Sequence, residues 1–82
     1  MIFPRVRHLR EDLDLKQKDI ASIIGIDQST YSDYETGKLN IPIETFIKLA
    51  DYYNTSIDFL VGRTDKKWKS DKKTLYQVFF II

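Results

Sequence analysis

The side chains of this sequence that could do chemistry are hydrogen-bonding groups rather than catalytic ones. Four polar residues fall on the outer side of one predicted helix, at spacings of one, three and four. They are Gln28, Ser29, Ser32 and Asp33. Catalytic candidates are few, because His8 is the only histidine, cysteine is absent, and no Gly-rich phosphate loop or metal-ligand cluster occurs. We therefore expect no enzyme, no metal and no cofactor.

Two short helices joined by a glycine corner are predicted to hold this polar face. Residues 17–24 form the first helix, and residues 28–36 form the second after Asp27 as N-cap. Gly25 suits the positive φ that the corner needs, and Ala21 is small enough for the two helices to approach closely. The inner positions are apolar, as a steep helix crossing requires: Ile20, Ile24, Ile26, Tyr31 and Tyr34.

Three further helices complete the predicted domain, which covers residues 1–64. The first covers residues 4–14, starts at Pro4 and carries Val6, Leu9 and Leu13 on one stripe. The fourth covers residues 42–53 with Pro42 at its first position and Asn54 as its stop. The fifth is a short helix between the Ser56 cap and Gly62. We predict an all-α, five-helix fold.

Residues 65–82 differ in character and are predicted to be a basic linker followed by an apolar tail. The linker and tail carry five lysines against two aspartates, whereas residues 1–64 carry eight basic against ten acidic groups. Residues 74–82 (TLYQVFFII) are β-branched and aromatic, which favours a strand.

Neither the start of the chain nor its apolar runs indicate export or a membrane. The first residues contain no apolar h-region, and no run approaches the ~20 apolar residues of a membrane span. We therefore expect a cytoplasmic protein. Since the net charge is only +1, a nucleic-acid partner would have to be bound by a few well-placed cations.

Two stretches resemble the Cro/C1-type (XRE family) helix-turn-helix regulators typified by phage repressors. They are QKDIASIIGIDQSTYSDYETGK at 17–38 and IPIETFIKLADYYNTSIDFLVGRTD at 41–65. With the first helix, the resemblance covers about residues 4–64. It implies a bacterial or phage transcriptional regulator, expected to be a repressor, that binds double-stranded DNA sequence-specifically. The helix at about 28–36 would enter the major groove, and a homodimer would bind a palindromic operator.

The resemblance also implies roles for individual residues. The base-contacting positions are Gln28, Ser29, Ser32 and Asp33, and a glutamine can pair with adenine N6 and N7. The phosphate-contacting positions are Gln17, Lys38, Asn40, Thr30 and Arg10. Asp33 departs from the family's cationic or amide residue, so its carboxylate must accept from cytosine N4 or pair with a basic side chain such as Arg10. Lys16 departs from the family's threonine cap and cannot accept the capping bond.

Two regions are candidates for dimerisation. The family's usual contact is the apolar side of the fifth helix, around Ile57 and Leu60. The tail offers a second surface through Val78, Phe79 and Phe80, which we expect to pair between protomers rather than to dock on their own domain. The alternative function is a protein-interaction module, such as an antitoxin that binds its partner through the tail. The low net charge and the acid at Asp33 favour that alternative.

Overall fold

A computed structural model of the chain describes residues 1–67, which form five α-helices and no strand. The helices are α1 (Pro4–Asp12), α2 (Gln17–Ile24), α3 (Gln28–Thr36), α4 (Ile43–Tyr53) and α5 (Ile57–Leu60). The predicted all-α, five-helix architecture is confirmed for these residues. The strand expected at 74–82, with its dimerisation residues Val78, Phe79 and Phe80, lies outside the described residues.

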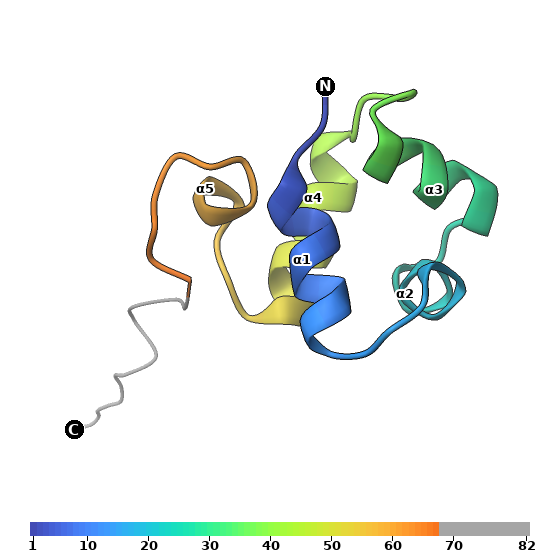
Figure 1. The fold of residues 1–82 in the computed structure, drawn as a ribbon, viewed down its shortest axis with the longest axis horizontal. Helices are drawn as coiled ribbons and strands as arrows, with labels where there is room; N and C mark the ends of the chain where they lie inside the picture. Colours follow the sequence, from blue (N-terminus) through green and yellow to red (C-terminus); the bar gives the residue numbers. More distant parts are fainter. Residues whose placement is uncertain (68–82) are drawn as a thin grey trace.

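The helices surround one apolar core. Figure 1 shows α1 in front of α4 at the centre, with α2 and α3 on one side and α5 on the other. Helix α2 packs on α3 and α4, and α1 packs on α3 and α5. The fully buried side chains come from all five helices and from Thr55: Val6, Ile20, Tyr31, Leu49, Thr55 and Leu60. At the top of the core, the rings of Phe3 and Phe46 meet edge to face at 5.3 Å.

The corner between α2 and α3 forms as the sequence predicts. Gly25 ends α2 with a φ of 76°, a left-handed conformation that costs glycine little. The N–H of Ile26 then donates to the carbonyl of Ala21 at 2.9 Å and closes the turn. Asp27 caps α3 by accepting from the N–H of Thr30 at 3.3 Å. Ala21 is only 1% exposed, as expected for a small residue where α2 packs closely on its neighbours.

Two helix ends differ from the prediction. Helix α1 stops at Asp12 rather than at residue 14, because the N–H of Leu15 turns back to the carbonyl of Arg10 and Asp14 adopts a φ of 57°. Leu13, expected in the core stripe, is consequently 54% exposed. Helix α4 begins at Ile43, with Pro42 as its extended N-cap rather than its first helical residue.

Candidate nucleic-acid interface

The outer side of α3 presents the four polar side chains that the sequence singles out. Gln28 and Ser29 are exposed, and Ser32 and Asp33 are half-buried. All four line one shallow hollow of about 470 Å³, together with Gln17 and the cap residue Asp27. The structure therefore brings the predicted base-contacting residues onto one surface beside the N-terminus of α2. We call this surface, made by these six residues, the α3 face.

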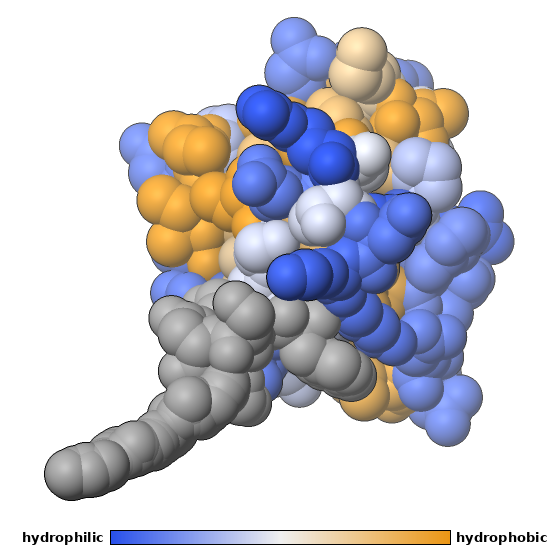
Figure 2. Space-filling view, turned by 90° about the vertical axis from the view of Figure 1, so that its left-hand side faces the viewer, coloured by the Kyte–Doolittle hydropathy of each residue, from blue (hydrophilic) through white to orange (hydrophobic). Residues whose placement is uncertain are grey.

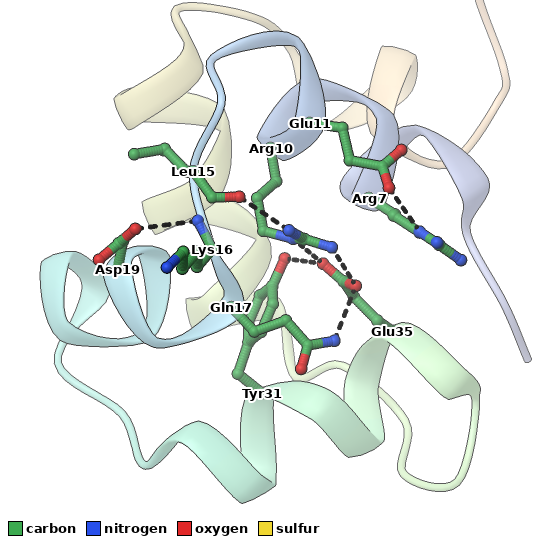
Figure 3. Close-up of polar contacts among 9 residues, drawn as sticks. All are labelled: Arg7, Arg10, Glu11, Leu15, Lys16, Gln17, Asp19, Tyr31 and Glu35. Atoms are coloured by element: carbon green, nitrogen blue, oxygen red, sulfur yellow. Dashed lines mark hydrogen bonds and ion pairs between the residues drawn. The ribbon is translucent and has the colours of Figure 1, made fainter.

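The inner side of α3 is held by one carboxylate, that of Glu35, which accepts from three other side chains (Figure 3). Arg10 of α1 binds it with two N–H groups, from Nε to Oε2 at 2.7 Å and from Nη2 to Oε1 at 3.0 Å. Gln17 of α2 donates from Nε2 to Oε1 at 3.1 Å, and the hydroxyl of Tyr31 donates to Oε2. Through Glu35, α1 and α2 together fix the position of α3.

The ionisation of this cluster favours a permanent ion pair. Burial by itself raises the pKa of Glu35, but hydrogen bonds from Arg10, Tyr31 and Gln17 outweigh it and leave the pKa lowered. The hydrogen bond to Glu35 raises the pKa of Arg10. Burial, followed by the hydrogen bond to Glu35, raises the pKa of the Tyr31 hydroxyl, so that it remains a neutral donor. The cluster is therefore charged but internally neutralised.

The fold and the α3 face agree with what the chain is similar to. A family model described as helix-turn-helix matches residues 6–60. The chain belongs to the Cro/C1-type helix-turn-helix family. The members of this family are DNA-binding transcriptional regulators.

Individual relatives support the assignment. The chain is 38% identical over 74 residues to the cryptic phage CTXphi transcriptional repressor RstR of Vibrio cholerae, covering 85% of this chain and 67% of the relative. It is 34% identical over 67 residues to the HTH-type transcriptional regulator AnsR of Bacillus subtilis, covering 82% and 58%. A crystal structure of a transcriptional regulator from Listeria innocua superposes with a TM-score of 0.68 and 31% identity, covering 85% and 66%. The helix-turn-helix chain thus spans about three-fifths to two-thirds of these relatives.

Arg10, expected as a phosphate contact, lies inside this helix-turn-helix domain instead. It is 9% exposed, and its remaining Nη1 group donates to the carbonyl of Leu15 at 2.8 Å. Each of its three guanidinium nitrogens therefore has a partner within the domain, and its charge is paired with Glu35 rather than with Asp33 or DNA. Sequence reasoning missed its partner, Glu35. The available signal was an acid at an inner helix position four residues after Tyr31, on the side facing α1.

The other phosphate-contact candidates lie around the α3 face. Lys38 and Asn40 are exposed in the loop after α3, which Leu39 anchors by donating its N–H to the carbonyl of Asp33 at 3.2 Å. Thr30 is half-buried. Gln17 is also half-buried, and its amide group is partly occupied by Glu35.

At the start of α2, Asp19 compensates in part for the capping threonine of the family, which Lys16 replaces in this chain. The backbone N–H of Lys16 donates to the carboxylate of Asp19 at 2.9 Å. Asp19 thus supplies one half of a capping box, and its charge also suits the helix N-terminus. The side chains of Lys16 and Lys18 are exposed on either side of Gln17. Two cations therefore flank the entrance to α2.

The expected dimer contact on α5 needs one correction. Leu60 is 1% exposed and packs in its own core, so its side chain offers no surface to a partner. Ile57 is half-buried. Figure 2 looks onto the α5 side and shows apolar side chains in two areas of its upper half, with hydrophilic side chains between them. Exposed Met1 and Ile2, with Leu60 and Val61 at the end of α5, line a hollow of about 340 Å³. Within residues 1–67, no helix has the length and apolarity that crossing a membrane demands.

Proposed function

We propose that this protein represses transcription by inserting α3 into the major groove of an operator and reading its bases with the α3 face. The observation that carries this proposal is the exposure of Gln28, Ser29 and their neighbours on one polar surface at the helix-turn-helix corner. Exposed polar side chains on such a surface can pair with base edges. Its place of action is then the cytoplasm, where a bacterial operator lies.

Cations at both ends of the α3 face would supply affinity that does not depend on sequence. Lys16 and Lys18 flank the N-terminus of α2, and Lys38 follows α3. The free N–H groups and positive dipole at the start of α2 also suit a phosphate, with Gln17 as the adjoining side chain. Since α3 itself contains no lysine or arginine, phosphate binding and base reading fall to different residues.

A homodimer on a palindromic operator forms part of the proposal. Two copies of α3 would then lie ~34 Å apart, one turn of B-DNA. The hollow lined by Met1, Ile2 and Val61 is the surface of the domain that we propose for this contact. Ile57, half-buried on α5, remains a candidate contact residue. The tail residues Val78, Phe79 and Phe80 are the second candidate.

Truncation after Lys73 should shift sedimentation towards monomer if the tail pairs protomers, whereas an unchanged dimer would assign the contact to the domain.

Salt dependence of duplex binding tests the proposal against a protein-interaction module. If three lysines in each of two protomers neutralise one phosphate each, the slope of log K against log salt is about −5. Affinity then falls roughly a thousandfold between 50 and 200 mM salt. Lys38→Ala should reduce the slope by about 2 for a dimer, because two phosphate contacts are lost.

A matched control makes this measurement specific to the α3 face. Lys66→Ala removes the same charge from an exposed position in the segment after α5, and α5 lies on the other side of the domain from α3 (Figure 1). It should leave the slope unchanged. Duplex binding with a flat salt response, or equal effects of the two substitutions, would contradict the proposed mode of binding.

A further inference from the structure

The base-reading surface of α3 is biased towards hydrogen-bond acceptors, and Ser29 is the first source of that bias. Its hydroxyl donates its only proton to the carboxylate of Asp27. Asp27 stays ionised because this bond, together with the N–H of Thr30, lowers its pKa. The outward side of the Ser29 hydroxyl therefore offers lone pairs and no proton.

Asp33 is the second source, because its carboxylate has no hydrogen-bond or ion-pair partner among residues 1–67. The two bonds formed at Asp33, from Thr36 Oγ1 at 3.3 Å and from the N–H of Leu39 at 3.2 Å, use the backbone carbonyl. In the part of the chain that the structure describes, no cation forms an ion pair with this carboxylate. Arg10, the basic side chain that the sequence offers as a partner for Asp33, is paired with Glu35 instead.

Both acceptors lie on one row of the helix. Ser29 and Asp33 are four residues apart, which separates them by about 6 Å along the helix axis and places them on the same side. A partner surface that covers one also covers the other. A carboxylate that loses water at such a surface without gaining a donor is strongly penalised.

In the major groove, amino groups are the donors that a base offers, and they belong to cytosine (N4) and adenine (N6). Each base pair carries one amino group in the major groove. An acceptor on the protein therefore determines which strand must carry the base with the amino group. At adenine the neighbouring N7 is an acceptor and repels the second carboxylate oxygen, whereas cytosine has no such neighbour. Guanine O6 and N7 and thymine O4 would repel a carboxylate directly.

We propose that Asp33 requires a cytosine on the strand facing α3 and that Ser29 requires a cytosine or an adenine about two base pairs away. This inference rests on the proposed docking of α3 in the major groove and adds the base types that it selects. Asp33 acts mainly by rejecting the wrong orientation, which costs affinity for other sequences rather than adding to the affinity for the right one.

Selection of bound duplexes from a random pool, followed by substitution of single atoms, tests this proposal. In the selected operator, the cytosine opposite Asp33 is replaced by 2-pyrimidinone, which lacks the 4-amino group and leaves the rest of the edge intact. The full chain should bind this duplex about 5- to 150-fold more weakly, the range expected for one good side-chain–base pair. Asp33→Ala, which removes both acceptor oxygens, should reduce that loss to less than twofold and admit other bases at this position.

Asp58→Ala is the matched control, since it makes the same change at an exposed position of α5, away from α3. It should keep the full loss on 2-pyrimidinone. A selected operator with guanine or thymine opposite Asp33, or an equal loss for wild type and Asp33→Ala, would overturn the inference while leaving DNA binding intact. Absence of any selected duplex would overturn both this inference and the proposed function.

Discussion

Replacing Arg10 by methionine should destabilise the domain far more than the loss of an ordinary surface charge. Methionine retains an unbranched side chain of comparable reach but removes the guanidinium. Glu35 then keeps its charge at neutral pH in a site where its side chain is 4% exposed, and it loses both hydrogen bonds from Arg10. An uncompensated buried charge is the main penalty of such a change.

The magnitude follows from the burial of both partners. Since the side chains of Arg10 and Glu35 are only 11% and 4% exposed, solvent screens their interaction little. Removing one partner of a buried pair costs about 3–5 kcal/mol. A described domain of 67 residues is expected to be stable by about 3–10 kcal/mol, so Arg10→Met should leave it marginally folded. Its melting temperature should fall by more than about 12 °C.

Thermal and urea unfolding followed by circular dichroism measure this effect against a control on the same helix. Arg7→Met removes an i,i+4 pair with Glu11 that is also 3.0 Å long, but whose side chains are 64% and 47% exposed. It should cost no more than about 0.5 kcal/mol. The double variant Arg10→Met with Glu35→Leu should be more stable than Arg10→Met alone, because no unpaired charge remains. Equal destabilisation by the two arginine substitutions, or no recovery in the double variant, would refute the reasoning.

Three other predictions concern the same domain. Because Arg10 and the other donors to Glu35 lower its pKa against the opposing effect of burial, this carboxylate stabilises the fold above its ordinary pKa of about 4.3 and loses that contribution as pH falls further. The stability gap between wild type and Arg10→Met, measured by urea midpoints, should therefore be smaller at pH 3 than at pH 7; a constant gap would exclude Glu35 as its cause. Gly25→Ala should cost about 1–2 kcal/mol in thermal unfolding from its φ of 76° alone, since nothing lies within 4 Å of the added Cβ. Gln28→Ala should relax the preference at one operator position by about 1–3 kcal/mol in competition binding, and an unchanged preference profile would remove Gln28 from the base contacts.

Local chemistry made much of the fold predictable from sequence. The bounds of α2 and α3 follow from a glycine that must adopt positive φ and an aspartate that caps the next helix, and the structure has both helices at the predicted residues. Ser56 likewise caps α5 by accepting from the N–H of Phe59 at 3.0 Å. Such signals lie within a few residues of the structure that they specify, so one sequence suffices to read them.

Interactions between distant residues were not predictable in the same way. Arg10 was expected at the surface because arginine is usually exposed, and only its approach to Glu35, 25 residues later, makes its burial tolerable. Leu60 was expected on an open apolar side of α5, but the packing of α5 on α1 and α4 buries it. Likewise, only the pairing of Arg10 with Glu35 reveals that the Asp33 carboxylate has no partner among residues 1–67.

Amide chemical-shift mapping of the isotope-labelled chain with its selected duplex tests most directly whether α3 enters the groove. The largest changes are predicted at residues 28–33, with further changes at 16–18 and 38–40 at the two ends of the α3 face. Changes concentrated at Met1, Ile2 and Val61, with α3 unaffected, would contradict this mode of binding.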